Sequence, residues 1–490
     1  MRKKNSVAKN YMYNLIYQIL TILLPLITTP YLSRVLGAEK IGIYGYTTSI
    51  VTYFILFGSF GIAMYGQREI AYNQDNKEKK TSIFWELFFI RFISLFISIV
   101  LFIIVFCLYG KYTIYYQILI IQLIANMFDI SWFFQGIEEF DKTVIRNLIV
   151  KTFCLALIFI LVKNESDLWK YFFIFVLAEL IGNISIWLYV PKYINKFKFK
   201  NLNLFKHIKP TLLLFLPQIA IQIYTVLDKT MLGVMSNMSE VGYYEQAQKI
   251  VRVGTVMTGA LQIVMNSRIA NAYSKNDNKE IKNCLEKSFR FTWLISTPIM
   301  FELIGLSKMF VPWFYGNGFG RIVYIIIVSS PIIISIGLNG ITGIQYLVHT
   351  NKQNIFTKTV IYGSLINIVI NFLLIPYFGG VGAAISSVIA ETGILFFQLK
   401  YFKKMFSFEK ILKFGLNNLI SGVAMLVVLV IISNLIKITV INTVIVGLIG
   451  IIVYIFLLFV LKDKFFKDIF KLFKTSVTKK MKGGMHEKNN

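Results

Sequence analysis

Polar residues recur at helical spacing along one strongly apolar stretch of the chain, residues 243–267. A step of three or four positions places residues on one face of an α-helix. The residues that keep this step are Glu245, Gln248, Arg252, Thr255, Gly259, Gln262 and Asn266. A guanidinium can direct two donors onto one oxyanion. The stretch therefore predicts a helix with one polar face that can bind an anion through Arg252.

Three further apolar stretches carry the same kind of stripe. They hold Gln218, Gln222, Thr225 and Lys229, with Asp228 beside them; Asn14, Gln18, Thr21 and Pro25; and Gln122, Asn126, Asp129 and Gly136. The functional interpretation is a hydrated groove between helices. The structural alternative is that small and polar residues seal helix–helix contacts. Both stay open for the amides, whereas a charge as deep as Arg252 favours the groove, because burying it in lipid is costly.

Several other charged residues lie in or beside apolar stretches. Arg68 and Arg268 are expected at cytoplasmic helix ends, where they could anchor the topology or capture an anion. Glu86 and Arg91 could pair within one helix, since they are five residues apart. Isolated carboxylates at depth could bind a proton or sodium, or be neutral acids in packing, and these are Glu179, Glu302 and Glu391.

No motif for covalent chemistry is present in the sequence. The cysteines Cys107, Cys154 and Cys284 are scattered, and the three histidines lack metal-ligand spacing. A Walker A loop and a nucleophile elbow are also missing. We therefore expect a protein that is not an enzyme, uses no cofactor or metal and does not use ATP directly.

The elements that must position these residues are membrane-spanning helices. Of the 490 residues 56% are hydrophobic and 15% charged, and the mean hydropathy is +0.65. A spanning helix needs about 20 mostly apolar residues. Fourteen runs meet this requirement: 11–32, 41–65, 83–109, 115–137, 144–162, 169–190, 211–234, 243–267, 288–314, 321–348, 354–376, 380–399, 412–433 and 441–461. The predicted fold class is an all-α polytopic membrane protein.

The net charge of +27 follows the pattern of membrane topology. Most of the Lys and Arg residues fall in alternate loops, as the positive-inside rule requires of cytoplasmic segments. A basic face interleaved with aromatic residues is missing, so nucleic acid is not an expected partner. We expect a protein of the cytoplasmic membrane with both termini in the cytoplasm. The tail 462–490 resembles an interfacial amphipathic helix, or is a solvated charged segment.

The chain repeats itself at a shift of 200 residues. The segment from Lys40 to Tyr44 falls on that from Glu240 to Tyr244, and at a shift of 216 Phe140–Ile145 falls on Phe356–Ile361. Six spans per repeat give both halves one orientation, related by a two-fold axis along the membrane normal. The predicted organisation is a six-helix lobe at 1–190, a basic linker at 191–210, a second six-helix lobe at 211–400, two added helices within 401–461 and the tail at 462–490.

Two motifs carry a resemblance to a known family. The segment from Pro30 to Gly37, followed by Ile41-Gly-Ile-Tyr44, and the segment from Trp132 to Glu138 with Arg146, resemble polysaccharide flippases of the Wzx type. That branch shares a superfamily with multidrug extruders and lipid II flippases. The resemblance covers essentially the whole chain. It implies movement of an undecaprenyl-diphosphate-linked oligosaccharide to the outer leaflet by alternating access, for capsule, teichoic acid or another surface polysaccharide.

The resemblance gives the polar residues their expected roles. Arg252 and Lys229 become phosphate partners, and Arg68 and Arg268 diphosphate captors at the cytoplasmic mouth. The remaining expected substrate contacts are Asp228, Gln218, Gln222, Gln248, Glu245, Gln18, Asn126 and Asp129. Expected partners are the lipid-linked oligosaccharide, membrane lipids, H+ or Na+ as the coupling ion, and glycan polymerase and chain-length proteins. The alternatives are a small-molecule exporter of the same superfamily, a polytopic glycan polymerase or ligase, and a scaffold without transport.

Overall fold

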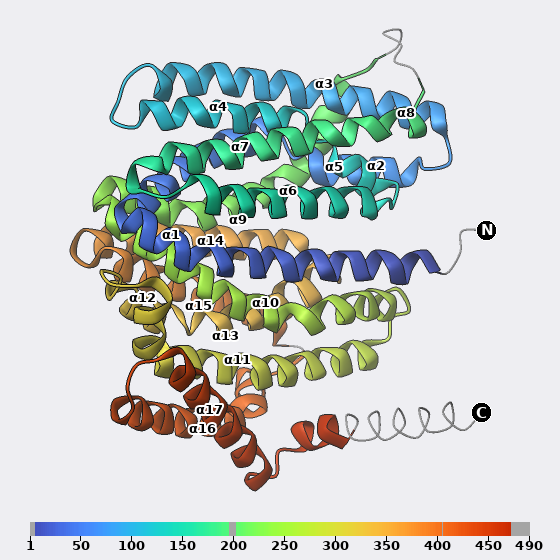
Figure 1. Cartoon of the computed structure of the whole chain (residues 1–490). Coiled ribbons are helices and arrows are strands. Elements are labelled where there is room, and N and C mark those ends of the chain that lie inside the picture. The colour runs from blue at the N-terminus through green and yellow to red at the C-terminus, as the bar shows by residue number, and fades with distance from the viewer. Residues whose placement is uncertain (1–4, 196–201, 404, 472–490) are drawn as a thin grey trace, which may run out of the picture. The chain divides into compact units, whose positions relative to one another are not determined.

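The computed structural model describes the backbone of residues 5–195, 202–403 and 405–471. Its side chains are described over the same ranges except at residues 5–23, 213, 214, 216–218, 220, 221, 223, 224, 260, 263 and 264. The described part of the chain is built from helices and contains no strand, which confirms the predicted all-α class (Figure 1).

The helices of the first half are α1 (Asn5–Ser59), α2 (Ile62–Tyr72), α3 (Lys77–Phe102), η1 (Ile103–Cys107), α4 (Thr113–Met127), α5 (Ser131–Gly136), α6 (Phe140–Leu161), η2 (Glu165–Asp167), α7 (Leu168–Ser185), η3 (Ile186–Tyr189) and α8 (Val190–Tyr193). Those of the second half are α9 (Phe205–Met235), α10 (Met238–Ser274), α11 (Asn278–Tyr315), α12 (Arg321–Ser329), α13 (Ile332–Asn339), η4 (Gly340–Val348), α14 (Gln353–Phe378), α15 (Gly380–Phe402), α16 (Phe408–Leu435) and α17 (Val440–Val460).

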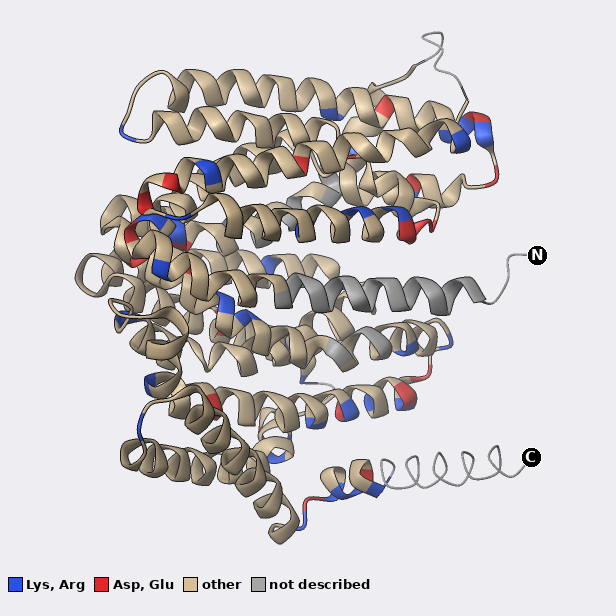
Figure 2. Ribbon diagram, viewed as in Figure 1, with Lys and Arg blue, Asp and Glu red and all other residues tan. Residues whose placement is uncertain are grey.

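Helices are the expected elements because a bilayer offers no partners for backbone polar groups, so each segment must satisfy its own. In the described residues, 11 helical segments are long and apolar enough to cross a membrane, which makes the chain a multi-pass membrane protein. Lys, Arg, Asp and Glu lie mainly toward helix ends and leave long uncharged stretches between them (Figure 2). Side chains cap several helix starts; Asn76, for example, accepts from the Lys79 amide at the start of α3.

The run predicted at 11–32 and most of the run 41–65 fall on one continuous element, α1, which contains a break, and the end of the second run lies on α2. Gly37 has φ 71° and ψ 172°, outside the helical region, and so divides α1 into two helices. Only glycine adopts a positive φ of this kind without steric cost. The other predicted runs also fall on helices, while the total of fourteen spans stays a prediction.

Three of the predicted continuous runs are divided in the structure. The run 41–65 is divided between α1 and α2 at Phe60 and Gly61, which both have a positive φ. The run 115–137 breaks between α4 and α5, where the Asp129 carboxylate accepts from the Ser131 amide at 3.0 Å. The run 321–348 divides at Pro331, which lacks an N–H for a continuous helix, and then widens into the π-helix η4. Hydropathy alone could not show these breaks, because both sides of each break are apolar.

The described residues group into two compact units. Unit 1 contains Met1–Gln246 and Asn371–Ala383, and unit 2 contains Ala247–Ile370 and Ala384–Asn490. Helix α9 therefore groups by its contacts with the first half of the chain, although it begins the second sequence repeat. The lobe boundaries at 190 and 211 are boundaries of the repeat and stay a prediction.

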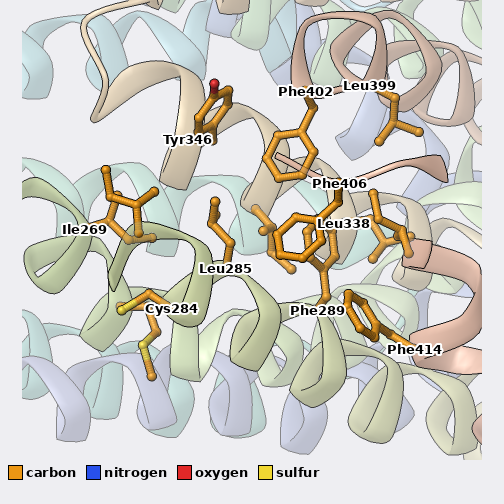
Figure 3. Close-up of a cluster of buried hydrophobic side chains, with 14 of the residues drawn as sticks. Ile269, Cys284, Leu285, Phe289, Leu338, Tyr346, Leu399, Phe402, Phe406 and Phe414 are labelled. Carbon is orange, nitrogen blue, oxygen red and sulfur yellow. The ribbon is translucent and has the colours of Figure 1, made fainter. Parts of the chain in front are cut away.

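Each unit has an aromatic core. In unit 1, Trp132 and Phe133 of the α5 motif are buried against Phe84 of α3, with the Phe84 and Phe133 rings 4.9 Å apart. In unit 2, Phe289 of α11 packs against Phe402 of α15 and Phe414 of α16 (Figure 3). Lipid tails are as apolar as these side chains, so such cores hold by van der Waals packing rather than by removal from water.

The described part of the tail begins a short helix. Residues 464–471 are helical, and Asp463 accepts from the Phe466 amide at 2.9 Å as its cap. The rings of Phe466 and Phe470 contact Phe459 of α17 at 4.9 and 5.3 Å. The remainder of the predicted amphipathic tail, 472–490, lies outside the described residues.

Candidate functional site

In the polar stripe of α10, Gln248 and Gln262 make hydrogen bonds to other helices, whereas Arg252 between them is exposed. Gln248 donates to Ser329 Oγ at 3.3 Å, and Gln262 donates to the Gly337 carbonyl at 2.9 Å. Arg252, between these two residues, has an exposed side chain. Within the described residues that side chain makes no hydrogen bond or ion pair. The stripe thus presents a single accessible guanidinium in the middle of a long helix.

The two charged residues near the end of α9 are already engaged. Lys229 Nζ lies 3.0 Å from Glu245 Oε2 of α10, with side chains 23% and 19% exposed. Asp228 is 4% exposed and accepts hydrogen bonds from Tyr244 Oη at 2.5 Å and from the Asn371 amide at 2.7 Å. Both side chains are engaged within the protein, so a ligand at Lys229 would have to replace Glu245.

The α4 stripe joins a network with the neighbouring helices α3 and α7. Gln122 and Asn126 donate to the two carboxylate oxygens of Glu179 on α7, at 3.2 and 3.1 Å. Arg91 of α3 is 3% exposed; it lies 3.3 Å from Asp129 Oδ2 and donates to the Asn126 carbonyl at 2.8 Å. A buried guanidinium with a carboxylate and a carbonyl partner avoids the cost of an isolated charge.

Arg146 extends this network to α6. Its guanidinium donates to Asn183 Oδ1 at 3.2 Å and to Ser131 Oγ at 3.4 Å, and Ser131 in turn donates to Asp129 at 2.6 Å. The sequence predicts Asn126 and Asp129 as substrate contacts. The structure brings them together with Arg91, Arg146 and Glu179, and their polar groups are used mainly inside the protein.

The expected pairing of Glu86 with Arg91 within α3 is wrong. Glu86 is fully buried and accepts from His207 Nε2 at 2.9 Å and from Lys206 Nζ at 2.9 Å, both at the start of α9. The other ring nitrogen of His207 lies 2.8 Å from Tyr65 Oη of α2. A separation of five residues puts Glu86 and Arg91 on different faces of the helix, so each finds a partner on another element.

The remaining predicted residues are scattered. Arg68 has a side chain that is 42% exposed, 3.5 Å from Glu69. Arg268 is exposed and lines a cavity of 480 Å³ at the turn from α10 to α11, together with Ser267, Asn271, Ala272, Lys275, Asp277 and Glu280. Gln222 is exposed, and the side chains of Gln18 and Gln218 lie outside the described residues.

The two deep carboxylates of unit 2 differ in their surroundings. Glu391 of α15 accepts from the Asn339 amide at 2.6 Å. Glu302 of α11 lies against Gly447 of α17, where an added Cβ would be 2.8 Å from its Oε1, and it makes no hydrogen bond within the described residues. The role of either carboxylate as a proton or sodium site stays a prediction.

Comparisons with known proteins agree with this architecture. Residues 7–259 match the family described as "Polysaccharide biosynthesis protein". A protein of Escherichia coli (strain K12) that is named as an O-antigen transporter is 27% identical over 79% of this chain and 94% of its own length.

Two solved structures share the fold. The lipid II flippase MurJ, in an inward closed conformation, matches with a TM-score of 0.73 at 19% identity, over 94% of this chain and 100% of its own. An inward-facing multidrug resistance transporter of the MATE family matches with a TM-score of 0.62 at 13% identity, over 80% of this chain and 95% of its own.

Proposed function

Because the chain belongs to the polysaccharide biosynthesis protein family, we propose that it is a flippase for undecaprenyl-diphosphate-linked oligosaccharides. The observation that carries this proposal is Arg252, an exposed guanidinium inside a polar stripe on the long helix α10, which contains the predicted span 243–267. The name of the E. coli relative, an O-antigen transporter, supports the same class of cargo.

The cargo explains why such a stripe is needed. A diphosphate and a hydroxyl-rich sugar must cross a hydrocarbon layer, where each unsatisfied polar group costs several kcal/mol. Arg252 supplies a forked donor for a phosphate, and Thr255 and Gln248 supply hydroxyl and amide groups on the same face. The polyprenyl tail stays in lipid or against the added helices α16 and α17.

Transport proceeds by alternating access, with the two repeat halves rocking about a site near mid-membrane. The sequence has no nucleotide-binding loop, so the driving force is an ion gradient or the membrane potential. Moving one charge through the potential is worth about 2.3 kcal/mol per 100 mV. H+ or Na+ is the coupling ion, and polymerase and chain-length proteins take up the product for capsule, teichoic acid or another surface polysaccharide.

The proposed location is the cytoplasmic membrane with both termini in the cytoplasm. Single cysteines at Asn73, Asn278 and Asn354, in a background without native cysteines, should resist an impermeant thiol reagent in intact cells. One at Asn317 should react. Labelling of the first three from outside would reverse the orientation.

The MATE-like fold makes a small-molecule exporter the second candidate. A glycan polymerase or ligase is less supported, because such an enzyme needs a sizeable external loop and the connection between α9 and α10 is only Ser236–Asn237. A scaffold without transport does not account for the stripe.

Reconstitution separates these candidates. Purified protein in liposomes that hold a lipid-linked oligosaccharide should move headgroups to the far leaflet without nucleotide. Efflux of a cationic dye in the same liposomes should be no faster than in protein-free liposomes. Dye efflux without headgroup movement would favour the exporter, and a strict ATP requirement would remove the alternating-access proposal.

A further inference from the structure

Two glycines at equivalent positions of the repeat lie against each other in the structure. Gly42 of α1 and Gly242 of α10 are 200 residues apart. A Cβ atom added to Gly42 would lie 3.0 Å from the Gly242 nitrogen, and one added to Gly242 would lie 3.1 Å from the Gly42 nitrogen. Both residues belong to unit 1, and the helices cross here with their backbones in contact.

The surroundings of the two glycines repeat in the same way. The added Cβ of Gly42 would lie 2.6 Å from the Met238 carbonyl carbon, and that of Gly242 would lie 2.9 Å from the Ala38 carbonyl carbon. Ala38 and Met238 are themselves 200 residues apart. The shift of 200 residues therefore maps the contact of Gly42 with Met238 onto the contact of Gly242 with Ala38.

Two further contacts are related by the same shift of 200 residues. Tyr46 packs onto Gly233, and at the equivalent positions Gln246 donates to Ser33 Oγ at 3.3 Å. Gly45 faces its own equivalent, Glu245, with an added Cβ 3.8 Å from the Glu245 Cβ. Reciprocal contacts of this kind define an isologous interface, in which the two-fold axis passes through the contact. The axis of the sequence repeat therefore runs through the Gly42–Gly242 crossing.

At the two glycines the helices approach to backbone distance. Small residues let membrane helices approach to backbone distance, where van der Waals contact and weak Cα–H···O interactions hold them. At Gly42 and Gly242 the heavy atoms nearest to an added Cβ are all backbone atoms, so the two helices meet there through their backbones. Nearby, Ser49 and Thr230 share a hydrogen bond of 2.8 Å, and Lys229 pairs with Glu245. These polar contacts would exchange for water when the helices part.

We propose that the Gly42–Gly242 crossing is the gate that closes the outer end of the transport path, an inference that rests on the proposed function. Both glycines lie just after the turns at Gly37 and Ser236–Asn237, which the charge distribution places on the outer side. Contact on the two-fold axis closes the path symmetrically, and rocking of the halves opens it.

The test introduces a single methyl group at the crossing. Gly42→Ala and Gly242→Ala each place Cβ against backbone, which cannot move aside as a side chain can, so the helices must separate. Gly45→Ala is the matched control one turn away, because its Cβ would meet Val241 Cγ1 at an ordinary 3.4 Å. Gly259→Ala, with no heavy atom within 4 Å of the added Cβ, controls for helix propensity on α10.

The readout is the accessibility of a cysteine below the gate. Ser49 is 1% exposed, so a cysteine there, with Cys107, Cys154 and Cys284 replaced, should react slowly with an impermeant maleimide in intact cells. Gly42→Ala or Gly242→Ala should raise the rate at least about 10-fold, and the double variant should add little, because both changes open one contact. Gly45→Ala and Gly259→Ala should leave the rate unchanged.

Equal labelling in the gate variants and the controls would overturn the proposal, since the crossing would then be fixed packing. If the alanine variants fail to fold, a second measurement remains. Ser49→Cys with Thr230→Cys should form a disulfide under oxidation, stop headgroup movement in liposomes, and release it on reduction. Full transport in the crosslinked form would also exclude a gate.

The labelling assay uses no substrate, so it separates the two proposals. A wild-type protein that moves no oligosaccharide, combined with faster labelling in Gly42→Ala, would remove the proposed function and keep the gate. Normal movement of oligosaccharide, combined with unchanged labelling in Gly42→Ala, would keep the proposed function and remove the gate.

Discussion

Around the break between α4 and α5, each of four charged side chains is bonded to a neighbouring element, whereas Arg252 in the middle of α10 is exposed. Arg91 meets Asp129, Glu179 meets two amides, and Arg146 meets Asn183 and Ser131. In membrane proteins polar residues serve both as interhelical contacts and as the lining of transport paths. The difference suggests that the first region holds its unit together and that the second is available to a ligand.

The largest expected effect is on stability in the first region. Arg91→Met should lower the free energy of unfolding by about 3 kcal/mol, because Asp129 would be left without its cation partner. Thermal unfolding of the purified protein in detergent measures this. Asp129→Asn should lower the free energy of unfolding less, since it removes the charge but keeps an acceptor for Ser131. An unchanged melting temperature in Arg91→Met would mean that the network is not structural.

Arg252→Ala should have the opposite profile. Losing a charged donor to phosphate costs roughly 1.5–3 kcal/mol, so headgroup movement should fall roughly 10- to 100-fold while thermal stability stays at the wild-type value. Arg252→Lys keeps the charge without the fork and should be intermediate. Val253→Ala, one step around the helix, is the control. Equal losses in Arg252→Ala and Val253→Ala would assign the stripe to packing.

Lys229 and Glu245 lie between these two cases, because the pair is partly exposed. Lys229→Met and Glu245→Gln should each lower stability by about 1 kcal/mol or less, and the double variant should recover part of the loss. A double-mutant cycle on thermal unfolding measures the coupling. If the two effects simply add, the contact contributes no coupling energy and Lys229 is free to exchange partners.

The smallest expected effect is at Glu179. Glu179→Gln keeps one carbonyl acceptor for Gln122 or Asn126 and loses the other, which should cost about 1 kcal/mol or less. The measurement is again thermal unfolding, with liposome transport at two pH values as a second readout. A pH dependence of transport that disappears in this variant would place proton coupling in unit 1 and weaken the contrast drawn above.

Much of the fold followed from local patterns. Runs of apolar residues located the helices, since a bilayer admits few other elements. Periodicity identified which residues share a face of α10 or α4. The breaks at Gly61, Asp129 and Pro331 do not follow from the hydropathy, because hydropathy averages over a window whereas a break depends on one or two residues.

The candidate site was less accessible to sequence reasoning. Arg252 is conspicuous in the sequence because it is a charge inside an apolar run, and its role as a phosphate partner stays a prediction. Glu86 was assigned to Arg91, although its partners Lys206 and His207 lie some 120 residues further along the chain. No short-range pattern encodes a pairing between distant helices.

The sequence by itself determined that this is a multi-pass helical membrane protein with a repeat at a shift of 200 residues, because composition and register are properties of the chain alone. The tertiary structure decided which face of each helix meets another. It used the polar face of α4 in internal contacts, left Arg252 exposed and brought Gly42 against Gly242. The physical reason is that helical periodicity fixes where a side chain points on its own helix, while the neighbour it meets depends on how the whole bundle packs.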